Sequence, residues 1–152
     1  MLNFLENHDE QRIASDFFAG DPRKGVPALI VSACMNTNPM MIYFGQEFGE
    51  MGMDSEGFSG RDGRTTIFDY WSVESLRNWN NNGLFDGAKL TPAERSLREM
   101  YAKLLNVVRS EPVIVEGAFY DLMYANSGNP YSIRTVSMRS CANGRTRYFW
   151  LS

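Results

Sequence analysis

A histidine stands between an asparagine and an aspartate near the start of the chain, and side chains of these types can bind a ligand or take part in catalysis. Asn7, His8 and Asp9 follow a short apolar stretch. An aspartate can stabilise a positively charged reacting centre, and a neighbouring histidine can donate a hydrogen bond to a hydroxyl group. From the residues alone, two simpler interpretations stay open. Asp9 can cap a helix, and His8 can be a hydrogen-bonded structural histidine.

The elements that position these residues are predicted from the spacing of apolar side chains. Residues 1–6 have the pattern of a short strand, and residues 9–18 that of a helix. A longer helix is expected over residues 24–36, with Pro27 in its first turn. The continuous apolar run 40–44 is typical of a strand buried on both faces. The order strand, helix, strand predicts one βαβ unit with parallel strands.

Further helices are expected beyond a long loop that is rich in Gly, Ser and Asp, at residues 51–66. Residues 72–79 predict a short helix. Thr91, Pro92 and Glu94 have the types and spacing of a capping box with proline at the first helical position. The apolar residues that follow keep helical spacing, so this helix is expected to run to about Ser110.

The last part of the chain, after about residue 112, has the alternation of antiparallel strands. Strands are expected at residues 113–115, 118–124, 132–140 and 145–151. Residues 141–144 contain an Asn-Gly pair, which is typical of a tight hairpin turn.

Composition limits the class of partner. Of the 152 residues, 43% are hydrophobic and 22% charged, which is ordinary for a globular protein. With a net charge of -3 and no basic block, nucleic acid is not expected as a partner. The longest apolar run is too short to cross a bilayer, so no membrane span is expected.

Three sequence motifs, in order, resemble the α-amylase family, glycoside hydrolase family 13. Phe4-Leu5-Glu6-Asn7-His8-Asp9 with Arg12 resembles the family's fourth signature region, and the run from Pro39 to Gly49 resembles its eighth strand and following turn. Asp62-Gly63-Arg64 through Trp71 resembles a loop that carries an Asp and an Arg towards bound sugar. The resemblance implies an α/β fold: the last two βα units of a (β/α)8 TIM barrel over residues 1–111, then part of an antiparallel C-terminal sandwich domain over 112–152.

The resemblance also implies roles for individual residues. Asp9 would be the catalytic carboxylate that stabilises the transition state, and it would bind substrate together with a second group of residues: His8, Asn7, Arg64 and Asp62. Arg12, Glu47 and Gln46 would support the site, and no metal ligand is expected. Some alternatives stay open. Glu47 can instead contact substrate, and Asp62 and Arg64 can be solvated loop charges.

Arg12 has three options within the same region of the chain. It can pair with Asp9, pair with Glu6, or fix the loop.

The function that the resemblance implies is that of a parent enzyme, a retaining glycosidase acting on α-glucosidic bonds of starch-like glucans or maltooligosaccharides. Its nucleophile and acid/base would lie on earlier barrel strands, so this chain alone is expected to be inactive. No cofactor is expected in this segment, although calcium is compatible with the parent. The expected partner is an α-glucan or oligosaccharide, and exposed sheet edges favour self-association.

Two competing hypotheses stay open. One is a non-catalytic carbohydrate-binding or structural chain with a family-13-like fold, and the other is a small α/β domain without sugar function. No signal segment is visible, so the localisation is undecided between a secreted, periplasmic or cell-surface parent and other compartments.

Overall fold

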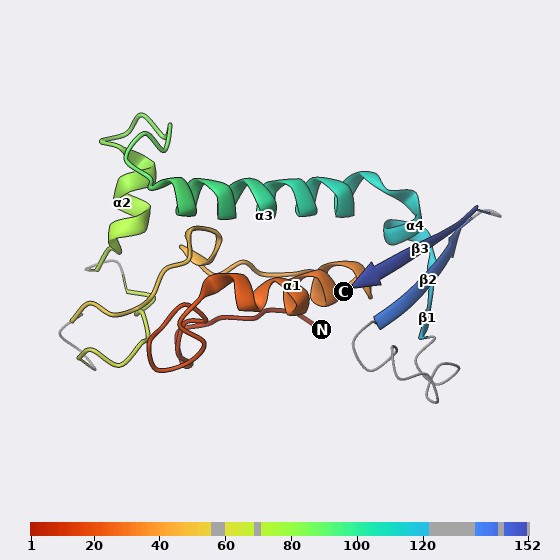
Figure 1. Cartoon of the computed structure of the whole chain (residues 1–152), viewed down its shortest axis with the longest axis horizontal. Coiled ribbons are helices and arrows are strands. Elements are labelled where there is room, and N and C mark those ends of the chain that lie inside the picture. The colour runs from red at the N-terminus through yellow and green to blue at the C-terminus, as the bar shows by residue number, and fades with distance from the viewer. Residues whose placement is uncertain (56–59, 69–70, 122–135, 143–144, 152) are drawn as a thin grey trace.

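The chain consists of short helices and turns, then one long helix, and a small sheet at its end (Figure 1). The computed structural model describes residues 1–55, 60–68, 71–121, 136–142 and 145–151, and beyond Phe119 it describes the backbone alone. In chain order, the elements are η1 (Pro22–Gly25), α1 (Val26–Cys34), η2 (Gln46–Phe48), α2 (Glu74–Asn80), α3 (Pro92–Ser110), α4 (Pro112–Glu116), β1 (Ala118–Asp121), β2 (Val136–Ala142) and β3 (Arg145–Leu151).

The two strands expected at residues 1–6 and 40–44 reduce to a single parallel bridge between Asn3 and Met40. The Asn3 N–H donates to the Pro39 carbonyl at 2.9 Å, and the Met41 N–H donates to the Asn3 carbonyl at 2.8 Å. Helix α1 lies between the two segments in the sequence. The order and the parallel direction are therefore those of the expected βαβ unit, but the strands are much shorter than expected.

The prediction of a helix over residues 9–18 is wrong, because these residues form bends and turns. Their amide groups are used elsewhere. The Arg12 N–H donates to the Gly63 carbonyl at 2.7 Å, and the Ile13 N–H donates to a carboxylate oxygen of Glu6 at 2.7 Å. In a helix over residues 9–18, the Ile13 N–H would have to donate to the Asp9 carbonyl, four residues earlier. The long-range contacts therefore replace the helix that local spacing predicted.

The core lies where α1 and α3 run alongside each other, and side chains of the bridged segments pack against it (Figure 1). Leu29 of α1 packs with Leu97 and Tyr101 of α3, and all three are buried. The partly buried side chains around them come from both bridged segments and from α3: Leu5, Met40, Ile42, Met100 and Leu104. Burial of a leucine contributes about 1.5–3 kcal/mol. This cluster thus fixes the segments that carry the predicted site.

The long helix α3 confirms the prediction from its capping box. The Thr91 hydroxyl accepts from the Glu94 N–H at 3.3 Å, and the Glu94 carboxylate accepts from the Thr91 N–H at 2.7 Å. The helix ends at Ser110, as expected. The helix expected over 24–36 appears as η1 followed by α1, with Pro27 in the first turn of α1, and the helix expected over 72–79 appears as α2.

The prediction of a strand at residues 113–115 is wrong, because these residues belong to helix α4. Ile114 and Val115 both donate their N–H groups to the Glu111 carbonyl, and Pro112 fits the first turn. Val113 and Ile114 are buried in this conformation. That burial outweighs the preference of β-branched residues for strands.

An antiparallel sheet follows α4, with strand order β1-β2-β3. Ala118 pairs with Cys141, and Ala142 pairs with Arg145. Residues 122–124 and 132–135 of the expected strands, and the Asn143-Gly144 pair of the expected turn, lie outside the described residues. Among the described residues, no helix is long and apolar enough to cross a membrane. The assignment to a barrel and a sandwich domain stays a prediction.

The capping box provides the first testable prediction. We expect Thr91→Ala to lower the free energy of unfolding by about 1 kcal/mol, because the Glu94 N–H loses its acceptor. Urea denaturation followed by circular dichroism measures this change. Thr37→Ala is the matched control, since Thr37 is exposed and lies outside the helices. Equal losses in the two variants would contradict the role of the cap.

Candidate functional site

A turn built by Asn7 presents the residues with the predicted chemistry. The side-chain oxygen of Asn7 accepts hydrogen bonds from the N–H groups of Asp9 at 2.8 Å and Glu10 at 3.0 Å. A short side chain that accepts from the backbone two residues on stabilises a turn. Asn7 thus holds the backbone on which His8 and Asp9 sit. Its side-chain oxygen is occupied in this way, and its predicted role in binding substrate stays a prediction.

His8 and Asp9 lie next to each other in solvent. Nε2 of His8 is 3.5 Å from Oδ1 of Asp9, and their side chains are 47% and 74% exposed. No helix begins at Asp9, so the helix-cap interpretation of this residue is wrong. The carboxylate accepts no hydrogen bond from the described residues, and it is therefore accessible to a ligand.

Arg12, by contrast, is fully buried beneath this turn and connects three segments. Its Nε lies 3.0 Å from a carboxylate oxygen of Glu6. One terminal nitrogen donates to the Phe44 carbonyl at 2.8 Å, and the other donates to the Thr65 hydroxyl at 2.9 Å. The guanidinium also lies over the Tyr43 ring, 4.7 Å from its centroid, a cation–π contact. Arg12 therefore pairs with Glu6 rather than with Asp9, and it also fixes the loop at Thr65.

Glu6 is the buried partner of Arg12, with only 3% of its side chain exposed. One carboxylate oxygen accepts the Ile13 N–H, and the other faces Arg12. No hydrogen bond reaches this second oxygen or Nε of Arg12 within the described residues, so attraction between charges holds that contact. Burial raises the pKa of Glu6 above its usual value, although the charge of Arg12 and the Ile13 N–H act in the opposite direction.

The loop at residues 62–65 lies directly against the segment that follows Asp9. Gly63 has a φ of 83°, and a Cβ there would stand 2.2 Å from the Ser15 hydroxyl. Gly52 also packs closely against this loop, because its Cβ would be 2.7 Å from the Gly63 backbone. Only glycine fits both places. The backbone of this loop is thereby held against Arg12.

Asp62 and Arg64, the loop residues predicted to bind sugar, contact each other. Asp62 accepts from Nε of Arg64 at 2.8 Å and from the Arg64 N–H at 3.0 Å. Their side chains are 25% and 39% exposed. The two loop charges therefore form an ion pair that remains partly exposed to solvent. The guanidinium of Arg64 is held in one orientation at the surface, on the loop that Arg12 anchors.

Gln46 and Glu47, the predicted supports, belong to η2 beneath α3. Gln46 is buried, accepts the Tyr43 N–H at 3.2 Å and donates to the Tyr101 hydroxyl at 3.1 Å. It thus links the second bridged segment to α3. Glu47 is half-buried, and burial raises its pKa although the charge of Arg98 on α3 acts against this. Both residues face the helix layer.

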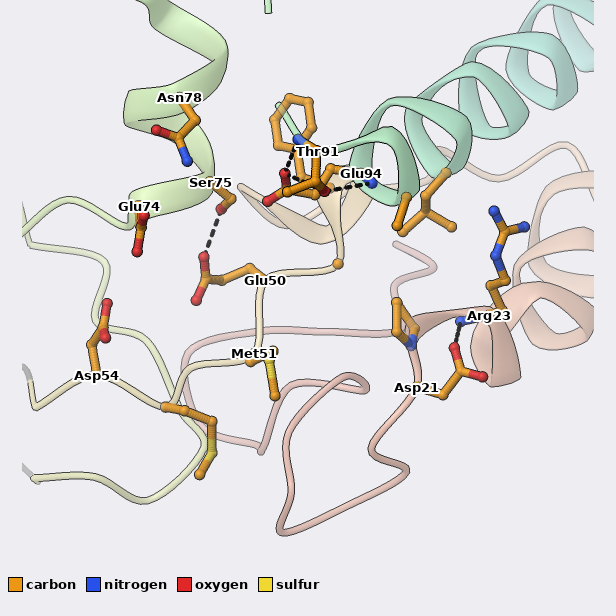
Figure 2. A pocket seen from close by; sticks show the side chains of 16 residues that line it. Asp21, Arg23, Glu50, Met51, Asp54, Glu74, Ser75, Asn78, Thr91 and Glu94 are labelled. Carbon is orange, nitrogen blue, oxygen red and sulfur yellow. Dashed lines mark hydrogen bonds between the residues drawn. The ribbon is translucent and has the colours of Figure 1, made fainter. Parts of the chain in front are cut away.

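A pocket of about 500 Å³ lies elsewhere, between η1, α2 and the start of α3 (Figure 2). None of the predicted sugar-binding residues lines it. Three of its carboxylates bind within the protein: Glu50 accepts from the Ser75 hydroxyl at 2.6 Å, Asp21 caps η1 and Glu94 belongs to the capping box of α3. The pocket and the turn at Asp9 are therefore separate features.

Sequence reasoning gave no site role to Glu6 or Thr65. Glu6 carried a visible signal, since a carboxylate within an otherwise apolar strand pattern needs a partner when it is buried. Thr65 carried none, because its contact with Arg12 spans 53 residues. Within the part of the chain that the structure describes, no group of three His, Cys, Asp or Glu side chains could hold a metal ion.

Comparison with known proteins identifies no relative of this chain. No family model, no curated protein and no solved structure matches it.

The buried ion pair leads to a second prediction. We expect Arg12→Met to lower the free energy of unfolding by about 3–5 kcal/mol, because Glu6 would remain buried without its counter-charge. Urea denaturation at neutral pH measures the change. Arg109→Met, on the exposed end of α3, should change stability by less than about 0.5 kcal/mol. A loss in Arg12→Met no larger than in this control would contradict the role of the pair.

The raised pKa of Glu6 leads to a third prediction, on pH dependence. A carboxyl group whose pKa is raised by folding binds its proton more tightly in the folded state. Its contribution to stability therefore grows as the pH falls through the raised pKa towards the usual value of 4.5. We expect the free energy of unfolding of the unmodified chain, relative to that of Glu6→Gln, to increase as the pH is lowered from about 7 to about 5. A decrease over this interval would refute the direction of the shift.

Proposed function

We propose that this chain is part of an α-amylase-type retaining glycoside hydrolase acting on α-glucosidic bonds of starch-like glucans or maltooligosaccharides, in which Asp9 stabilises the transition state. The observation that carries the proposal is an accessible carboxylate next to an accessible imidazole, on a turn with a buried, fixed base. An accessible polar pair on a rigid support is what sugar hydroxyls require. The ordered sequence motifs give the substrate class.

The chemistry assigned to Asp9 is electrostatic. Glycoside hydrolysis passes through an oxocarbenium-like transition state, in which the sugar ring gains positive charge. A carboxylate fixed near that ring binds the transition state more tightly than the neutral substrate, and this difference raises the rate. His8 would donate a hydrogen bond to a hydroxyl of the same sugar. The Asn7 turn supports both roles, because it keeps the two side chains adjacent.

The loop of Asp62 and Arg64 would supply a second set of sugar contacts. Arg64 is oriented by Asp62, and a guanidinium has five N–H donors in a planar arrangement. Donors that are already oriented lose little conformational entropy when they bind hydroxyl groups. The Arg12–Gly63 hydrogen bond keeps this loop beside the segment that follows Asp9. The two predicted sugar-binding segments are thus neighbours.

In the proposed architecture, the bridged segments are the last two strands of a barrel. The parallel bridge, with α1 between its two segments, supports this assignment. Leu2 and Phe4 flank the bridge and are 47% and 46% exposed. Apolar side chains beside an open strand edge favour contact with further strands, either from the same enzyme or by self-association.

The fourth prediction concerns turnover. We expect the 152-residue chain alone to show no hydrolysis of starch or maltooligosaccharides, because the nucleophile and the acid/base would lie on other barrel strands. In the complete enzyme, Asp9→Asn should lower kcat by about 10²–10³-fold, since a neutral amide does not stabilise the developing positive charge. Release of reducing sugar measures both activities.

The control for this experiment is Asp16→Asn. Asp16 is an exposed aspartate seven residues further on, outside the turn, and its replacement should leave kcat unchanged. Full turnover in Asp9→Asn would contradict both the role of Asp9 and the assignment to this class of enzyme. Sugar binding without any turnover in the complete protein would instead favour a non-catalytic binding protein.

A further inference from the structure

The two segments of the proposed sugar site are far apart in the sequence, and buried polar contacts connect them. The turn at residues 7–9 begins directly after Glu6, and the loop at residues 62–64 ends directly before Thr65. Glu6 and Thr65 both contact the guanidinium of Arg12, at 3.0 Å and 2.9 Å. All three side chains are buried. Each segment is thus attached, at its very end, to the same planar group.

We propose that Glu6 and Arg12 are positioning residues, which together set the place of the Asn7–Asp9 turn relative to the Asp62–Arg64 loop. The proposal rests on the proposed function for its consequence in catalysis, and on the contacts of Arg12 for its geometry. Neither Glu6 nor Arg12 reaches the surface, so both act through the residues that they hold.

The shape of the guanidinium explains how it would position three segments at once. Its Nε faces Glu6, one terminal nitrogen donates to the Phe44 carbonyl, and the other donates to Thr65. The angles between these directions are fixed because the group is planar and delocalised. A lysine has three donors on one freely rotating ammonium, and it would not fix the relative places of its partners. The segments that contain Glu6, Phe44 and Thr65 are therefore held in fixed directions by one rigid guanidinium.

Stability alone does not account for this arrangement. Replacing a buried ion pair by well-packed apolar residues is often neutral or stabilising, because the desolvation of both charges is then avoided. Apolar side chains, however, would not fix directions. A displacement of about 1 Å in a site can lower the rate about 10²-fold. The fixed geometry is therefore what the buried pair would contribute to the site.

The test uses the histidine of the turn as a probe. The sequence contains a single histidine, His8, so its imidazole NMR signals report on the turn without overlap. Thr65→Val removes the acceptor of one Arg12 nitrogen but touches nothing in the turn. We expect it to shift the His8 signals, because the guanidinium reorients and carries Glu6 with it. In an Arg12→Met background, the same substitution should produce no further shift of these signals.

Thr66→Val is the matched control, since Thr66 is the next buried threonine and its hydroxyl accepts the Phe68 N–H within the loop. It should leave the His8 signals in place. Unfolding by Arg12→Met is checked by circular dichroism, and Arg12→Lys replaces it if the fold is lost. The proposal would be overturned if Thr65→Val left the His8 signals unshifted, or if it shifted them equally in the unmodified chain and in the Arg12→Met background.

The catalytic consequence is tested in the complete enzyme with Glu6→Gln, which keeps an acceptor for the Ile13 N–H but removes the charge that faces Arg12. We expect kcat to fall about 10²-fold with maltooligosaccharide as substrate. In Glu6→Asp, which keeps the charge, kcat should fall by less. Unchanged kcat and KM in Glu6→Gln, where Asp9→Asn is inactive, would overturn the positioning role. Activity that survives Asp9→Asn would reject the proposed function instead, and the NMR experiment would still decide the coupling.

Discussion

The contact between Glu6 and Arg12 is the constraint on which the first half of the structure depends. Both side chains are removed from water, where isolated charges are costly, so neither can stay without the other. The requirement extends outwards, because the remaining nitrogens of Arg12 need acceptors too, and Phe44 and Thr65 supply them. The course of the chain from residue 6 to residue 15 and the place of the loop around Gly63 follow from this need.

Close packing of the backbone also holds the loop around Gly63 against Arg12, in addition to the attraction between charges. Gly52 and Gly63 meet without side chains between them, and Gly63 lies against Ser15. The polar groups of the loop are then within reach of the buried arginine, while Asp62 and Arg64 satisfy each other at the surface. The interior of this region is therefore polar and fixed, and the apolar core of Leu29, Leu97 and Tyr101 lies on its helix side. The exposed turn with Asp9 stands on this polar interior.

What could be predicted from sequence follows the range of the interactions involved. The start and end of α3 were predictable because Thr91 and Glu94 satisfy each other within one turn. Residues 9–18 were not, because the amide groups of Arg12 and Ile13 bind partners that no local pattern reveals. The run 113–115 failed for a related reason, since burial rather than β-propensity decides its conformation. For the site, the adjacency of His8 and Asp9 was readable from the sequence, whereas the partner of Arg12 was only one of three options.

The span of the Arg12–Thr65 contact has a consequence for the order of folding. The contact closes a loop of 53 residues, and the entropy cost of closure comes before this hydrogen bond stabilises anything. Helix α3, whose signals are local, can form without it. During synthesis, the turn at Asp9 leaves the ribosome before Thr65, and it lacks its base until Thr65 has followed. The turn at Asp9 therefore reaches its native arrangement late, and Glu6 and Arg12 must remain hydrated until then.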